Sequence, residues 1–433
     1  MRVAFLMPGA GGSFYCENCM RDAGLVRALH DLGHDPITVP LYLPLQLDEP
    51  TPAPPTPVFF GGINVFLQQK LGLFRHTPRW LDRLFDAPRL LRWAAKRAGM
   101  TNPRTLAETT LSMLRGEEGR QVKELERLVA WLRDTERPDL VCLSNALLLG
   151  VARSVKRELA APVVCCLQDE DIFLDGLPEG YREEAWATVR ERARDADLFI
   201  AVSGYFAAVM RKRLDLPAGR LRVVHNGIAP DGYGPAPCPP DPPAIGFLER
   251  ACPEKGLDIL VEAFLRLRER EEFAAARLKI AGGMGAPDRP FVRSIRKRLA
   301  RRGAGDAAEF LPNLDRPARQ EFLRSLSVLS VPARHGEAFG MYVLEALASG
   351  VPVVLPRHGA FPELVEATGG GVLYEPNEPQ ALADALSELL ADRQRAAQLA
   401  RQGRRAVLEA FTIERTAEKT LAAFREALSV GSS

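Results

Sequence analysis

The chain has 433 residues, 46% of them hydrophobic, and carries 57 Lys and Arg against 55 Asp and Glu. This length is enough for two or three ordinary domains, and the near balance of charge gives no general case for binding nucleic acid. No apolar run approaches the roughly 18 residues that span a bilayer. Seven cysteines, several of them in apolar runs, favour a reduced cytoplasmic protein over a disulfide framework.

The chain opens with RVAFLM (2–7), which predicts a buried strand and not a secretory signal. A glycine-rich turn follows, with Gly11 and Gly12, and then the pair Cys16 and Cys19. Three interpretations of the pair stay open: thiols that pack in a loop, a redox pair, or a metal knuckle. The loop is favoured, because zinc normally needs four ligands and the sequence has no second C-x-x-C pair. The stretch also fails the last glycine of the dinucleotide-binding fingerprint.

The remainder of the first half alternates between apolar strands and helical patterns. We expect a helix over 23–34 and strands over 36–42, 140–144, 162–167, 197–203 and 222–227. Nearly continuous hydrophobic strands separated by helices predict a parallel sheet that is covered on both faces.

The stretch 70–100 departs from this alternation, because eight Lys and Arg stand against two Asp, with Phe and Trp between them. It predicts an inserted helical subdomain, within about 70–130, that packs on the first domain. A basic, aromatic face at the inner surface of a membrane and an acceptor-binding wall are the alternatives.

A proline-rich segment, PAPCPPDPP (235–243), predicts a stiff linker. The alternation then restarts with strands over 244–248, 278–282, 309–312, 328–333, 352–356 and 371–376, and a helix over 256–270. The fold class predicted is therefore α/β, with two doubly wound domains (1–234 and 244–410) facing each other across a cleft. Ligands of such sheets bind beyond the carboxyl ends of the strands.

The most informative motif is RHGEAFGMYVLEALASGVPVV (334–354), which places Glu337 eight residues before Glu345. A helix is expected to begin near Phe339–Gly340, so that its unpaired amides suit a diphosphate. Glu345, two turns into the helix, suits the hydroxyls of a ribose. The alternative is that both glutamates only serve the helix, Glu337 at its dipole and Glu345 in solvent.

The second cluster, ERACPEKGLD (249–258), follows the first strand of the second domain. Arg250 and Lys255 can neutralise a diphosphate leaving group without a metal. Taken alone, such a pair is more typical of a solvated turn.

Together these residues resemble the family 4 glycosyltransferases, which are retaining enzymes of the GT-B fold. The order of Arg250 and Lys255, AGG (281–283), the two glutamates and Pro362–Glu363 is the family's order. The resemblance spans the chain, because AVSGYF (201–206), HNGI (225–228) and FTIERTAEKTLAAF (411–424) also match. The last of these resembles a final helix, 411–433, that crosses back to the first domain.

The resemblance implies a UDP-, GDP- or ADP-sugar donor in the second domain, and neither a metal nor a cofactor. Arg250 and Lys255 would hold the diphosphate, Glu345 the ribose and Glu337 the sugar side. The other donor-binding candidates are Phe339, Gly340, Met341, Gly283, Gly11 and Gly12. The acceptor, which would be a sugar, a lipid-linked molecule or a small molecule, would bind the first domain. Its candidate residues are Gln168, Asp169, Asp171 and Asn226.

The chain departs from the family at three places. Glu249 stands where the family often has glycine, Gln168 stands where it commonly has histidine, and His335 directly precedes the glutamate motif. Asp169 and Asp171 also form a D-x-D pair, which holds a metal in the other large glycosyltransferase fold. Two alternative functions share the architecture: a sugar-nucleotide epimerase and a non-catalytic nucleotide-sugar-binding protein.

Overall fold

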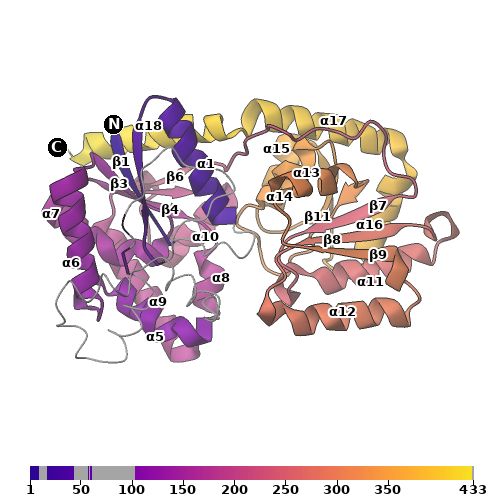
Figure 1. The fold of residues 1–433 in the computed structure, drawn as a ribbon, viewed down its shortest axis with the longest axis horizontal. Coiled ribbons are helices and arrows are strands. Elements are labelled where there is room, and N and C mark those ends of the chain that lie inside the picture. The colour runs from indigo at the N-terminus through magenta and orange to yellow at the C-terminus, as the bar shows by residue number, and fades with distance from the viewer. Residues whose placement is uncertain (9–16, 43–56, 58, 61–102, 432–433) are drawn as a thin grey trace. The chain divides into compact units, whose positions relative to one another are not determined.

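A computed structural model of the chain describes residues 1–8, 17–42, 57, 59–60 and 103–431 (Figure 1). Gly11, Gly12, Cys16 and the basic, aromatic stretch 70–100 lie outside the described residues, as does the side chain of Cys19. What the sequence predicts for them therefore stays a prediction.

The described chain forms two compact units. The first runs to His225 and includes the chain from Thr416 onward, and the second runs from Asn226 to Arg415. Each unit has one parallel six-stranded sheet with helices on its faces (Figure 1). The prediction of two doubly wound, Rossmann-like parallel sheets is confirmed.

The sheet of the first unit has the strand order β2-β1-β3-β4-β5-β6. Its strands are β1 (Arg2–Met7), β2 (Asp35–Pro40), β3 (Leu140–Leu143), β4 (Val163–Leu167), β5 (Leu198–Ala201) and β6 (Leu221–Val223). Its helices are α1 (Glu17–Asp31), α5 (Pro103–Leu114), α6 (Val122–Trp131), α7 (Ala152–Leu159), α8 (Glu170–Asp175), α9 (Glu179–Arg192), α10 (Gly204–Leu214) and α18 (Ile413–Gly431). The order reverses between β1 and β3, which is where such sheets bind ligands.

The sheet of the second unit has the order β12-β11-β10-β7-β8-β9. Its strands are β7 (Ala244–Leu248), β8 (Arg277–Gly282), β9 (Ala308–Pro312), β10 (Val328–Leu329), β11 (Val353–Pro356) and β12 (Gly371–Tyr374). Its helices are α11 (Leu257–Arg268), α12 (Arg289–Arg301), α13 (Arg316–Arg324), α14 (Met341–Ala348), α15 (Phe361–Thr368), α16 (Pro379–Ala391) and α17 (Arg393–Ala410). Here the order reverses between β7 and β10.

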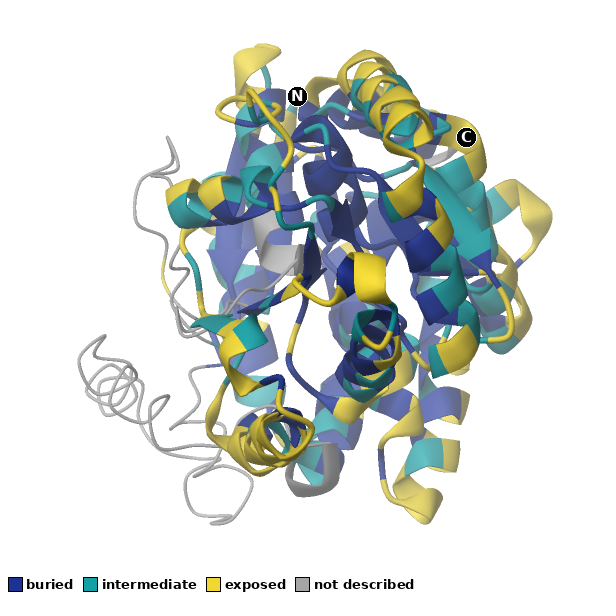
Figure 2. Ribbon diagram, turned by 90° about the vertical axis from the view of Figure 1, so that its right-hand side faces the viewer, coloured by how far each residue is buried: buried dark blue, intermediate teal, exposed yellow. Residues whose placement is uncertain are grey.

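The strands are buried because their side chains are apolar on both faces. Every residue of β3, β4, β5, β7 and β11 is buried, whereas α12 and α17 contain many exposed residues. Figure 2 shows this contrast between buried strands and exposed outer helices. The continuous apolar runs of the sequence therefore correspond to the strands at the centre of each sheet.

The division between the units differs from the expected boundary after residue 234. Residues 226–234 belong to the second unit, because Tyr233 donates a hydrogen bond to Glu345 at 2.6 Å and Arg316 donates to the carbonyl oxygens of Ala229 and Asp231. The chain rejoins the first unit at Thr416 within α18, where Phe424 packs on Phe5 and Glu426 pairs with Arg222.

Candidate functional site

The residues expected to carry chemistry in the second unit follow the two strands at which its order reverses. Arg250 and Lys255 come after β7, and Glu337 comes after β10, which pairs with β7. Because parallel strands end at one edge of a sheet, these side chains gather beyond the carboxyl ends. Lys255 and Glu337 are 82 residues apart in the sequence, and the fold brings their side chains into contact.

Lys255 lies between two buried carboxylates. Its Nζ is 2.7 Å from Oε1 and 3.0 Å from Oε2 of Glu337, and 3.6 Å from Oε2 of Glu249. The Tyr342 hydroxyl approaches Oε2 of Glu337 at 3.4 Å. The side chain of Glu337 is only 2% exposed. A buried charge requires compensating partners, and here the Lys255 ammonium and the Tyr342 hydroxyl serve as these partners.

Arg250 is held by Asp288 at the start of α12. Its Nε is 2.9 Å and its Nη2 2.8 Å from Oδ1 of Asp288, while Oδ2 accepts the amide of Gly285 at 2.9 Å. Burial lowers the pKa of Arg250, but the hydrogen bond and the charge of Asp288 outweigh this and raise it. The guanidinium is therefore a fixed cation beside the end of β7.

Two glycines let the loop backbones approach each other. Gly256 has φ +73°, and a Cβ there would lie 1.8 Å from the carbonyl oxygen of Pro332. Gly282 has φ +121°, and a Cβ there would lie 2.1 Å from the carbonyl oxygen of Glu249. Gly283, a predicted donor contact, lies beside the side chain of Arg250, and its carbonyl accepts the amide of Ala251 at 2.9 Å.

The helix expected near Phe339–Gly340 is α14, which begins at Met341 after Gly340 with φ +92°. All eight residues of α14 are buried, as are Phe339 and Gly340. The amino end of this helix, where its dipole is positive, therefore lies at the same edge of the sheet as Lys255.

Glu345 is buried and does not face solvent. Its Oε1 accepts the Tyr233 hydroxyl at 2.6 Å and Arg319 Nε at 3.1 Å, and the side chains of Arg319 and Glu345 are only 4% and 3% exposed. The alternative that Glu345 is a solvated residue of the helix surface is therefore wrong. Arg319 and Tyr233 were missed from the sequence, because neither lies within a recognisable motif.

Three further residues of this edge were also not predicted to act there. Asp288 and Glu249 contact the two cations as described above. His358, after β11, is half-buried and packs on the Phe361 ring with centroids 6.2 Å apart. Burial lowers the pKa of His358, although Glu337 opposes the shift. His335, in contrast, is exposed.

Gln168 lies at the carboxyl end of β4 in the first unit and belongs to a buried polar cluster. Its Nε2 donates to the carbonyl oxygen of Ser144 at 2.6 Å and lies 3.5 Å from Oδ1 of Asp22. Asp22 in turn pairs with Arg21 at 2.7 Å and accepts the Ser144 hydroxyl. The cluster joins residues that follow β3 and β4 to the helix that follows β1.

The two aspartates of the D-x-D pair flank a buried glutamate. Asp169 has φ +57° and precedes α8, and Asp171 lies in its first turn. Between them, burial raises the pKa of Glu170 to about 8, and its carboxylate accepts the amides of Gln168 and Ala146. Asn226 belongs to the second unit, where its buried Oδ1 has no hydrogen-bond partner among the described residues.

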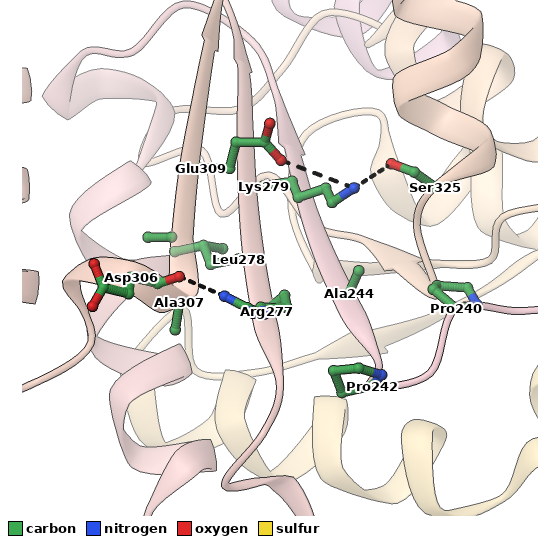
Figure 3. A pocket seen from close by; sticks show the side chains of 11 residues that line it. Pro240, Pro242, Ala244, Arg277, Leu278, Lys279, Asp306, Ala307, Glu309 and Ser325 are labelled. Atoms are coloured by element: carbon green, nitrogen blue, oxygen red, sulfur yellow. Dashed lines mark hydrogen bonds and ion pairs between the residues drawn. The ribbon is translucent and has the colours of Figure 1, made fainter.

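A pocket of about 290 Å³ lies at the opposite, amino edge of the second sheet (Figure 3). Its polar groups are mutually paired: Lys279 Nζ is 2.9 Å from Ser325 Oγ and 4.0 Å from Glu309 Oε2, and Arg277 donates to the carbonyl oxygen of Asp306. This pocket is therefore separate from the group of residues around Arg250 and Lys255, which lies beyond the carboxyl ends of the strands.

No helix in the described part of the chain has the length and apolar character needed to cross a membrane. Nor do residues 1–8, 17–42 and 103–431 bring three or more His, Cys, Asp or Glu side chains into an arrangement suited to a metal ion.

Comparison with known proteins agrees with this organisation. Residues 236–406 match the model of glycosyl transferases group 1, and residues 107–231 match glycosyltransferase family 4. The α-maltose-1-phosphate synthase of Mycolicibacterium smegmatis is 32% identical over 275 residues, which cover 58% of this chain and 68% of that protein. The D-inositol 3-phosphate glycosyltransferase of Jonesia denitrificans is 33% identical over 227 residues, covering 52% and 50%.

The chain thus spans about half the length of several curated relatives that it matches. Among solved structures, Anabaena HepE in complex with UDP and glucose superimposes with a TM-score of 0.67, at 18% identity, over 98% of this chain and 100% of that one. That likeness shows the GT-B fold. The two family models and the M. smegmatis relative show that the chain belongs to the group 1, family 4 glycosyltransferases.

Proposed function

We propose that this protein transfers a sugar, with retention of the anomeric configuration and without a metal, from a nucleoside diphosphate sugar to an acceptor. The observation that carries the proposal is the meeting of Arg250, Lys255 and Glu337 where the order of the second sheet reverses, beside the start of α14. This arrangement combines two cations, the amino end of a helix and a buried carboxylate within one site.

The proposed transfer requires stabilisation of the negative charge that develops on the leaving group. Breaking the glycosidic bond leaves negative charge on the nucleoside diphosphate, and groups that are already fixed in place stabilise it best. Arg250, held by Asp288, and Lys255, held by Glu337, supply the positive charge, and the amino end of the α14 dipole adds partial positive charge. The leaving phosphate then serves as the base that accepts the proton of the acceptor hydroxyl, so no protein carboxylate has to.

The two glutamates have separate roles in this proposal. Glu337, which contacts Lys255, serves the sugar side of the donor. Glu345 serves the ribose, and Arg319 and Tyr233 fix the orientation of its carboxylate. A variant of Glu345 is therefore expected to weaken nucleotide affinity, and a variant of Glu337 to lower turnover.

The donor nucleotide and the acceptor are proposed only as classes. The Anabaena structure contains UDP and glucose, and other relatives are named for GDP-mannose or for inositol 3-phosphate. We therefore propose a UDP-, GDP- or ADP-sugar as the donor, and a sugar, a lipid-linked molecule or a small molecule as the acceptor. Gln168, with the cluster around it, is the first candidate on the acceptor side.

Activity measurements test the proposal. Lys255→Ala and Arg250→Ala should each lose about 10²–10³ in turnover, the usual effect of removing one electrostatic donor of this kind, and should remain folded. Glu254→Gln, an exposed change in the same loop, is the matched control. Transfer should survive EDTA, and NMR of the product should show the donor's anomeric configuration. Loss of transfer in EDTA, with recovery on adding Mn²⁺, would contradict the metal-free mechanism.

A further inference from the structure

The edge of the second sheet that carries Arg250 and Lys255 also contains a buried carboxylate, Glu249. It directly follows β7 and is 7% exposed. Its Oε1 accepts the Arg250 amide at 2.7 Å, and its Oε2 is 3.6 Å from Lys255 Nζ. Lys255 therefore has two buried carboxylates as neighbours, since Glu337 contacts it at 2.7 and 3.0 Å.

The charges joined by these contacts do not favour an anionic ligand. Two are cations, Arg250 and Lys255, and three are anions, Glu249, Glu337 and Asp288. A nucleoside diphosphate adds at least two further negative charges at the same place. Like charges at such distances in a buried site strongly disfavour ionisation of all of them. Binding is therefore easiest if one carboxylate is neutralised.

The contacts single out Glu249 as that carboxylate. Glu337 keeps two contacts to the ammonium, and Asp288 is tied to the guanidinium by two nitrogens, whereas Glu249 is 3.6 Å from its nearest cationic atom. Burial raises the pKa of Glu249, with Lys255 opposing and Glu337 adding to the shift. His358, which faces Glu337, adds no cation above neutral pH, because burial lowers its pKa.

We propose that Glu249 takes up a proton from solvent when a nucleoside diphosphate binds to Arg250 and Lys255. The proton resides on Oε2, because Oε1 accepts the amide of Arg250. This inference rests on the proposed donor site. It makes donor affinity fall as the pH rises, by at most about tenfold for each pH unit when one proton is taken up per ligand.

Isothermal titration calorimetry of UDP, GDP and ADP tests the inference. Titrations at pH 7.5–8.5 in buffers with different ionisation enthalpies give the number of protons taken up for each ligand bound. The ligand's own phosphate, with a second pKa of about 6, is ionised in this range. Glu249→Gln keeps the oxygen that accepts the Arg250 amide but cannot ionise, and Glu254→Gln removes one exposed charge from the same loop as the matched control.

Wild type and Glu254→Gln should take up a proton on binding, by up to one per ligand, and Glu249→Gln should take up fewer and bind at least as tightly at pH 8.5. Equal proton uptake in wild type and Glu249→Gln, or no uptake by wild type, would overturn the inference while the donor site stands. If wild type binds none of the three diphosphates, the donor site and the inference both fail. The wild-type measurement needs no variant. If wild type takes up no proton, the inference is overturned even if Glu249→Gln does not fold.

Discussion

The buried pair of Arg319 and Glu345 should be one of the most sensitive points of the second unit. The Nε and Oε1 atoms are 3.1 Å apart, and both side chains are at most 4% exposed. Arg319→Met removes the cation beside the buried carboxylate of Glu345, which keeps the hydrogen bond from the Tyr233 hydroxyl. Loss of one partner of a buried ion pair typically costs about 3–5 kcal/mol.

This loss is large enough to measure by thermal unfolding. In a unit of this size, 1 kcal/mol corresponds to roughly 2–4 °C in Tm, so Arg319→Met should lower the Tm by about 6–20 °C. Circular dichroism of the full chain gives the Tm. Arg319→Lys keeps the charge but not the planar fork of donors, so its Tm should fall between those of wild type and Arg319→Met.

A double variant separates the buried charge from the loss of packing. Arg319→Met with Glu345→Gln removes both charges, so it should be more stable than Arg319→Met alone. A Tm for Arg319→Met within about 2 °C of wild type would refute this reasoning, and so would a double variant whose loss is the sum of the two single losses.

Three other predictions concern Glu170, Asp288 and the stretch 70–100. Because burial raises the pKa of Glu170 from 4.5 to about 8, the folded chain binds a proton there that the unfolded chain has released, and stability falls as the pH rises between these values. The Tm of Glu170→Gln minus that of wild type should therefore increase from pH 5 to 8 and stay constant above pH 8. A Tm difference that does not change with pH would count against the raised pKa of Glu170. Asp288→Asn should lower turnover with little change in Tm, because it frees the guanidinium of Arg250 from its fixed position; unchanged turnover would show that Asp288 does not position it. If the stretch 70–100 binds a membrane surface, the protein should sediment with anionic vesicles at low salt and be released at high salt, whereas absence of sedimentation would leave packing or a soluble acceptor as its role.

Much of the fold could be predicted from the sequence because the central strands are continuously apolar. The expected strand over 244–248 is β7, and the run over 352–356 contains β11. The boundary between the units could not be found in this way. It depends on long-range contacts such as the hydrogen bond from Tyr233 to Glu345, and the prolines of 235–243 were the stronger local signal.

Only part of the candidate site could likewise be predicted from the sequence. The positions of Arg250, Lys255 and Glu337 in loops that follow strands could be predicted because glycines and prolines mark those loops, and Glu345 lies in the predicted helix that follows. Their partners could not, since Asp288, Arg319 and Glu249 look like ordinary charged surface residues in the sequence and are buried only by the fold. The alternative that Glu345 faces solvent failed for the same reason: a single glutamate in a helical pattern does not reveal an arginine 26 residues away.

The central claim, that a nucleotide-sugar binds to Arg250 and Lys255, is tested most directly by thermal shift with UDP-, GDP- and ADP-sugars in EDTA. A ligand at 100 times its Kd stabilises by about 2.7 kcal/mol, or roughly 5–10 °C for a unit of this size. The account predicts a shift of this order with one class of nucleotide-sugar for wild type and for the Glu254→Gln control, and its loss in Arg250→Ala/Lys255→Ala. An equal shift in the double variant, or no shift with any of the three in wild type, would contradict it.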